Sequence, residues 1–249
     1  MEAFALISVA VYCSVSIYMA VRLLALARRT KEWPERLIGT AYVLGGMVGY
    51  PASVAARVLV DAGQTASAEF AHVAGQVGMA GAAFFLLLAW RRMFSSNGLA
   101  GLAFVMAWTS FMVVALGWTL FNTEAGSRSH MVTLPYWAML ISQGGCYTTL
   151  GWASFRHARM LHRRSALGLA DPLTANRMLL WALSNLCIVV SYVYTIGLGI
   201  MLRNGLPNIY NPAVISACGL LSAVFIGFAF FPPQAFVKRV RANATMGEA

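Results

Sequence analysis

Three polar side chains share one face of a long apolar stretch. Between Thr65 and Trp90, the residues Glu69, His72 and Gln76 follow at spacings of three and four, which places them on the same side of a helix. A histidine beside a carboxylate can bind a polar ligand, and it can change its charge near neutral pH. We therefore expect a central helix whose end forms a polar mouth.

The same stretch carries glycines every three residues, at positions 75, 78 and 81. Small residues at this spacing let the backbones of two membrane helices come close together. The pattern predicts a tight contact between this helix and a neighbour.

Further polar residues lie in other apolar stretches, and we predict that they complete an outward-facing cavity. The ligand-binding candidates are Glu69, His72, Gln76, Arg57, Tyr136, Gln143 and Tyr192. The same residues also fit an arrangement without a ligand, in which Glu69 pairs with Arg57 and the aromatic residues lie at the membrane interface. Asn185 is expected to form a hydrogen bond to another helix, for example to Gln143.

Cofactors are the next question, and the sequence predicts none. Glu69 and His72 have a Glu-x-x-His spacing that can present two metal ligands, and His130 is the third candidate because it precedes a segment that starts on the same side. Nothing in the spacing brings His130 to the other two, so we predict no metal. Haem with two axial histidines is not expected, because His72 is the only histidine within an apolar stretch. No catalytic residue is predicted either, because no spacing pairs a nucleophile with a base.

The composition requires a membrane around these residues. Of 249 residues, 59% are hydrophobic and only 10% are charged, which lies outside the range of soluble globular proteins. A membrane span needs about 20 apolar residues, and seven stretches meet that length. They are approximately 3–25, 37–60, 67–90, 99–121, 132–155, 177–201 and 211–232. We predict an all-α protein with a single seven-helix transmembrane domain over residues 1–236 and a short cytoplasmic tail over 237–249.

The basic residues predict the orientation. The loops on one side hold Arg22, Arg28, Arg29, Lys31, Arg36, Arg91, Arg92, Arg156, Arg159, Arg163, Arg164, Arg177, Lys238, Arg239 and Arg241, whereas the other side holds only Arg57, Arg128 and Arg203. Lys and Arg favour cytoplasmic loops. The N-terminus is therefore expected outside and the C-terminus in the cytoplasm. The net charge of +10 is explained by these loops, so nucleic-acid binding is not predicted.

Seven spans and an outside N-terminus invite comparison with the microbial rhodopsins, in which a lysine of the last span binds retinal. The only lysines here are Lys31 and Lys238, both outside the spans, and Val224 stands where such a lysine would be sought. Covalent retinal is excluded on chemical grounds. A rhodopsin-like architecture stays possible, but an architecture does not establish a function.

Three functions fit the sequence. The first is a sensor or receptor that binds a small molecule, or senses pH, in the outward cavity and signals through a separate cytoplasmic protein at the basic loops, because no loop is long enough for an output domain. The second is a channel or transporter for protons or a small solute. The third is a structural subunit of a membrane complex, with a homo-oligomer as one form of it. An intramembrane enzyme ranks last. In each case the protein is expected to be multi-pass, in the plasma (inner) membrane if the cell is prokaryotic.

Overall fold

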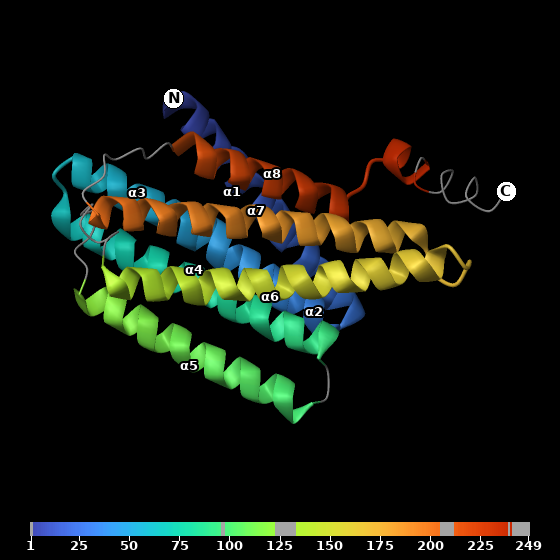
Figure 1. The fold of residues 1–249 in the computed structure, drawn as a ribbon. Helices are drawn as coiled ribbons and strands as arrows, with labels where there is room; N and C mark the ends of the chain where they lie inside the picture. The colour runs from blue at the N-terminus through green and yellow to red at the C-terminus, as the bar shows by residue number, and fades with distance from the viewer. Residues whose placement is uncertain (1, 96–97, 123–132, 205–211, 239, 241–249) are drawn as a thin grey trace.

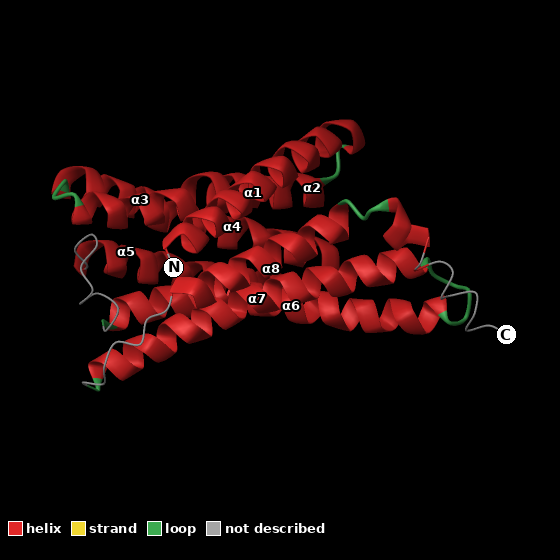
Figure 2. Cartoon of the chain, turned by 90° about the horizontal axis from the view of Figure 1, so that it is seen from above, coloured by secondary structure: helices red, strands yellow, loops and turns green. Residues whose placement is uncertain are grey.

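The protein is helical throughout the part that a computed structural model describes, which comprises residues 2–95, 98–122, 133–204, 212–238 and 240; these residues form no strand (Figures 1 and 2). Each of the seven predicted apolar stretches is a helix. The elements are α1 (Glu2–Thr30), α2 (Trp33–Tyr42), η1 (Val43–Gly49), α3 (Tyr50–Asp61), α4 (Thr65–Phe94), α5 (Leu99–Asn122), α6 (Leu134–Ser165), α7 (Pro172–Arg203) and α8 (Pro212–Phe230).

The second predicted stretch is a single helical rod, Trp33–Asp61, but its middle is not an α-helix. The seven residues of η1 form a π-helix, and the backbone N–H of Tyr50 donates to the carbonyl of Gly45, five residues earlier. Pro51 has no N–H to give to the regular α-helical ladder, which favours an irregular turn just before it. The sequence predicts an apolar span over 37–60, which this rod contains, but it does not predict the π-helix in its middle.

Successive rods run in opposite directions and pack side by side (Figure 1). Seen from above, α1, α2 and α3 lie on one side and α6 and α7 on the other (Figure 2). Helix α4 bridges them, since it packs against α2, η1 and α3 as well as against α6. Helix α8 packs between α1 and α7. Helix α5 packs on α4 and α6. The expected central position of the Thr65–Trp90 segment is confirmed by these contacts of α4.

The glycine face of α4 makes the predicted close contact, and its partner is the η1–α3 part of the second rod. A Cβ atom on Gly78 would lie 2.8 Å from the Cα of Gly49, and one on Gly75 would lie 2.5 Å from the Oγ of Ser53. A Cβ on Gly81 would lie 3.0 Å from the Cδ1 of Leu44. At Gly78 the nearest atoms are all backbone atoms, so no side chain fits there between the two rods.

In the described part of the chain, five helical segments are long and apolar enough to cross a membrane: Val9–Thr30, Trp33–Asp61, Thr65–Phe94, Leu99–Asn122 and Pro172–Arg203. Large apolar side chains are exposed on the outside of the bundle, such as Phe121 at 91% and Phe70 at 78%, as lipid contact requires. The chain is therefore compatible with a multi-pass membrane protein. Helix α6 and the described part of α8 do not meet the same criteria of length and hydropathy, so the seven-span count stays a prediction.

Candidate functional site

The predicted ligand-binding residues fall into two groups on different helix pairs. Arg57 near the end of α3 and Glu69 near the start of α4 are exposed, whereas His72, one turn further along α4, is 9% exposed and Gln76 is half-buried. The polar mouth thus becomes buried within two turns. Whether these four residues bind a ligand is untested by the geometry and stays a prediction.

The second group lies between α6 and α7. The Tyr192 hydroxyl donates to the Oε1 atom of Gln143 at 2.8 Å, and both side chains are buried. Tyr136 and Leu140 belong to the same buried cluster as Tyr192. The Nε2 atom of Gln143 has no hydrogen-bond partner among the described residues. Because an unsatisfied amide is costly inside a membrane bundle, this group has donor capacity left for a water or a ligand.

The expected partner of Asn185 was wrong. Its Nδ2 atom donates to the carbonyl of Trp181 in the same helix at 2.7 Å, and Gln143 bonds to Tyr192 instead. The metal candidate His130 lies outside the described residues. Among the described ones, no three His, Cys, Asp or Glu residues are grouped so that they could hold a metal ion.

A cavity of about 40 Å³ lies in the middle of the bundle, where α1, the second rod, α4, α6, α7 and α8 meet. About 10–15 Å³ of such space holds one water molecule, so the cavity has room for about three. None of the seven predicted ligand-binding residues lines it. The lining residues are Tyr12, Val15, Ser16, Ala41, Tyr42, Gly45, Gly46, Leu86, Tyr147, Trp181, Ser184, Asn185, Ile188, Ser222, Ala223 and Ile226.

Residues with hydroxyl or amide groups line this cavity from five helices, and the described lining contains no charged residue and no histidine. Ser184 on α7 and Ser222 on α8 are hydrogen-bonded through their hydroxyls at 2.8 Å, which ties these two helices together at the cavity wall. An uncharged wall of this kind suits a neutral hydrogen-bonding molecule, because a charged one would be buried without a counter-charge.

The π-helix forms one side of the cavity. Gly45 and Gly46 line it, and a Cβ atom on Gly46 would overlap the Oγ of Ser16 across the contact with α1. Single π-helical turns within membrane and soluble helices are frequent at functional sites. The sequence does carry a signal for this wall, the run Gly-Gly-Met-Val-Gly-Tyr-Pro at residues 45–51, which the prediction of a plain apolar span overlooked.

The cavity and the buried Gln143–Tyr192 pair are neighbours. The ring of Tyr147, which lines the cavity, lies 6.0 Å from the ring of Tyr192. Ile188 likewise lines the cavity and packs against the cluster that contains Tyr192. The two polar regions therefore form a continuous strip along the α6–α7 interface.

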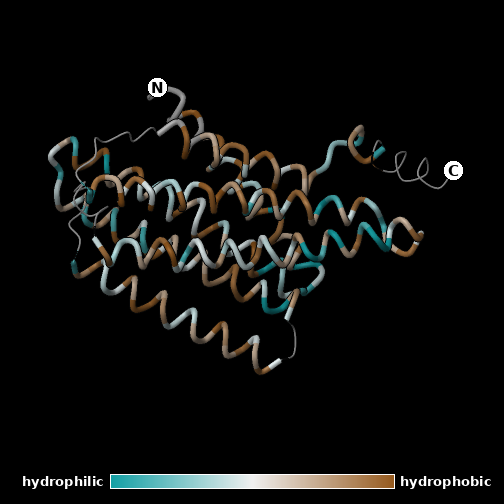
Figure 3. The backbone as a smooth tube through the Cα atoms, viewed as in Figure 1, coloured by the Kyte–Doolittle hydropathy of each residue, from teal (hydrophilic) through white to brown (hydrophobic). Residues whose placement is uncertain are grey.

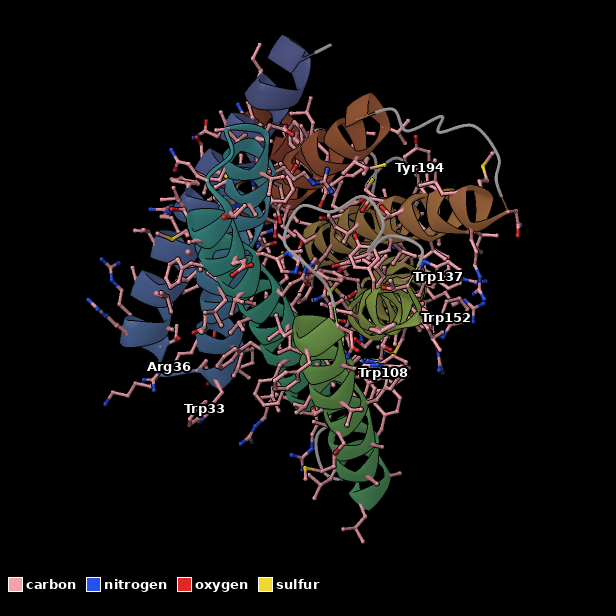
Figure 4. All side chains as sticks on the ribbon, turned by 90° about the vertical axis from the view of Figure 1, so that its left-hand side faces the viewer. Trp33, Arg36, Trp108, Trp137, Trp152 and Tyr194 are labelled. Atoms are coloured by element: carbon pink, nitrogen blue, oxygen red, sulfur yellow. The ribbon has the colours of Figure 1, made fainter. Side chains whose placement is uncertain are left out.

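Aromatic side chains secure the helices around this strip. The indole N–H of Trp108 on α5 donates to the carbonyl of Ser142 on α6 at 2.8 Å, and Trp108 lies next to α6 in Figure 4. At the end of the bundle away from the basic loops, the guanidinium of Arg203 lies 5.5 Å from the ring of Trp137. These contacts hold α6 in place, and α6 supplies both Gln143 and Tyr147.

Comparison with known protein families, with curated proteins and with solved structures gives no match. The functional inference therefore depends on the geometry of this chain alone.

Proposed function

We propose that the chain is a seven-span membrane protein with a rhodopsin-like up-and-down bundle, its N-terminus outside and its basic end in the cytoplasm. The support is the alternation of seven helical rods together with the collection of basic residues at one end of them. Figure 3 marks hydrophilic segments at the right-hand ends of α6 and α7 and around the start of α2. Two separate fusions at the C-terminus test the orientation, one to alkaline phosphatase and one to a fluorescent protein. We expect the fluorescent-protein fusion to fluoresce and the phosphatase fusion to be inactive.

Helix α6 is included although its mean hydropathy is low. From Leu134 to Phe155 it carries no charged residue, and this part is roughly 33 Å long at about 1.5 Å per residue. That length matches a hydrocarbon layer of about 30 Å. Its hydropathy is lowered by Ser, Thr, Gln and Gly, and Ser142, Gln143 and Ser154 among them are buried inside the bundle. The remaining turns, from Arg156 on, would project beyond the hydrocarbon into the basic end.

The protein's function, in this proposal, is that of a sensor or receptor whose central cavity binds a small uncharged molecule. The observation that carries the proposal is the cavity itself, with polar groups from five helices and a π-helical wall. An occupant there would touch α1, η1, α7 and α8 at once. A ligand that fits one arrangement of these helices better than another shifts the equilibrium between them, and a separate protein at the basic loops would respond to that shift.

Native mass spectrometry of the full chain in mild detergent tests the sensor proposal, because one spectrum reports bound mass and subunit number together. The cavity is blocked by Ala223→Leu, since Ala223 lines it and is 3% exposed. The control is Ala103→Leu on α5, where the side chain is exposed. A small neutral mass, or a thermal shift with small alcohols and amides, is expected in the wild type and in Ala103→Leu and not in Ala223→Leu. Equal behaviour of the two variants would refute the cavity as the binding site.

The polar strip favours a second candidate, a pathway for protons or a small solute. Tyr192, Gln143 and Tyr147 extend the polar lining beyond the cavity along α6 and α7. Tyr147→Phe removes a hydroxyl from the middle of this strip and keeps the ring. In liposomes loaded with a pH-sensitive dye, the pathway requires a proton flux that Tyr147→Phe reduces. If the proton flux does not exceed that of empty liposomes, the pathway proposal is contradicted and the sensor proposal is favoured.

A further inference from the structure

An exposed tryptophan at the basic end of the bundle is flanked by two arginines from different helices. Trp33 opens α2 and is 54% exposed. The guanidinium of Arg36 lies 5.8 Å from its ring centroid, and that of Arg92, in the last turn of α4, lies 5.9 Å away. Trp33 and Arg36 lie beside each other at the periphery of the bundle (Figure 4). The indole therefore holds two positive charges from separate helices at one place.

Trp33 and Arg36 of α2 and Arg91 and Arg92 of α4 form what we call the α2–α4 corner. Its arginines keep most of their hydrogen-bond donors unused. Arg36, Arg91 and Arg92 form no ion pair with any described residue. The Nε atom of Arg91 is buried and has no hydrogen-bond partner in the described part of the chain, and neither has the Oε2 atom of the nearby Glu35. A guanidinium carries five N–H donors in a fixed plane. The carboxylates of Glu32 and Glu35 thus form no ion pair with these arginines, whose donors stay open to another acceptor.

The position of the corner indicates which acceptor it meets. Tryptophan concentrates at the level of the lipid headgroups, where one side of its ring is apolar and the other is wet. Residues Ala80–Ala89 of α4, directly before Arg91, are uncharged and lie among the apolar core of the bundle. Arg91 and Arg92 therefore stand where the hydrocarbon ends, at the level where a membrane presents its lipid phosphates. The planar fork of arginine fits two oxygens of one phosphate group.

We propose that the α2–α4 corner is a binding site for the phosphate of an anionic phospholipid, with Arg36 and Arg92 as its ligands and Trp33 as the residue that positions them. This site is independent of the central cavity and of the sensor proposal. It differs from a general attraction to acidic lipids. The end of α6 carries Arg156, Arg159, Arg163 and Arg164. Among the described residues, the only ring contact of these arginines is that of Arg159 with Phe155 of the same helix, so simple charge attraction favours α6 whereas the geometry favours the α2–α4 corner.

The test counts lipids bound to the full chain by native mass spectrometry from micelles that contain phosphatidylglycerol and phosphatidylcholine in equal amounts. The site variant is Arg36→Gln with Arg92→Gln, and the matched control is Arg163→Gln with Arg164→Gln, which removes the same charge from exposed positions on α6. A basic residue near an acidic membrane surface changes binding by about fivefold. We expect one phosphatidylglycerol retained per chain in the wild type and the control, and roughly 25-fold weaker retention in the site variant.

Two further arms keep the result unambiguous. Trp33→Leu leaves every charge in place, and its expected loss of selectivity for phosphatidylglycerol would show that the indole positions the arginines. Inorganic phosphate at 10 mM or so is expected to leave the bound lipid in place; release of the lipid by phosphate would replace the lipid site with a free-anion site. Equal lipid loss in the site variant and the α6 control, at an unchanged helical circular-dichroism signal, would overturn the proposal in favour of diffuse charge attraction.

Discussion

The backbone contact between Gly78 on α4 and Gly49 in η1 makes a strong prediction about stability. In Gly78→Ala, the new methyl group would lie 2.8 Å from both the Cα and the N of Gly49, and 2.9 Å from the carbonyl of Leu44. All three are backbone atoms, which cannot rotate away. Ordinary contact starts at 3.4 Å, so the two rods must separate by about 0.6 Å at this point, the difference between 3.4 and 2.8 Å.

The expected cost can be isolated with a matched control. Gly117→Ala on α5 adds the same methyl where nothing lies within 4 Å, so it gains about 0.5–1 kcal/mol of helix propensity and nothing else. Gly78→Ala has the same gain, but overpacking costs about 1–3 kcal/mol. The free energies of unfolding of the two variants should therefore differ by that 1–3 kcal/mol. At roughly 2–4 °C per kcal/mol for a chain of this size, the midpoint temperatures should differ by about 2–12 °C.

The assay is thermal unfolding of the detergent-purified chain, followed by circular dichroism. Gly49→Ala should behave like Gly78→Ala, since its methyl would lie 2.7 Å from the N of Met79. The double variant should lose less than the sum of the two, because rods separated by one methyl have room for the other. Equal midpoints for Gly78→Ala and Gly117→Ala would refute the backbone contact, and strict additivity of the double variant would show that the two glycines do not share it.

Three further predictions use the same unfolding assay. Tyr192→Phe removes the hydrogen bond to Gln143 and leaves a second buried atom of that amide without a partner. The free energy of unfolding should therefore fall by about 1–3 kcal/mol. Adding Gln143→Leu should recover part of this loss, and no recovery would argue against the Gln143–Tyr192 hydrogen bond. Asp171→Ala removes the side-chain cap of α7, which accepts from the N–H of Leu173 at 3.2 Å, and should cost about 1 kcal/mol, whereas Asp171→Asn should keep most of it. Trp108→Phe loses the bond to Ser142 across the α5–α6 contact and should cost about 0.6 kcal/mol or somewhat more; a stabilised variant would contradict this bond.

The helices could be predicted because their signals are local. Apolar length alone locates the rods. The pair Asp171-Pro172 predicts the start of α7, and Asp171 is indeed the N-cap there, with Pro172 in the first turn. The glycines of α4 predict a close neighbour from spacing alone, although the spacing does not say that the neighbour is η1 and α3.

The cavity could not be predicted in the same way. Its polar residues are single serines, tyrosines and one asparagine spread over several helices, and Ser184, Ser222 and Asn185 among them form ordinary hydrogen bonds within or between helices. Asn185 illustrates this, because its side chain is free to bond to its own helix at Trp181 instead of crossing to Gln143. Which residues meet depends on how the rods pack and turn, and that information is not local.

The π-helix is the clearest case of such non-local information. The contacts of the glycines in residues 42–53 cannot be predicted from the 3.6-residue period of an α-helix, because η1 has more residues in each turn. The methyl position of Gly45 points at Ala82 and that of Gly49 at Met79, both on α4, while that of Gly46 points at Ser16 on α1. The wider turn thus packs η1 between α1 and α4, and the space beside Gly45 and Gly46 is part of the cavity. A substitution in this glycine run should therefore change the cavity while the helix content stays the same. Because η1 contacts the cavity, α1 and α4, we expect an occupant of the cavity to move α1 against α4 through η1.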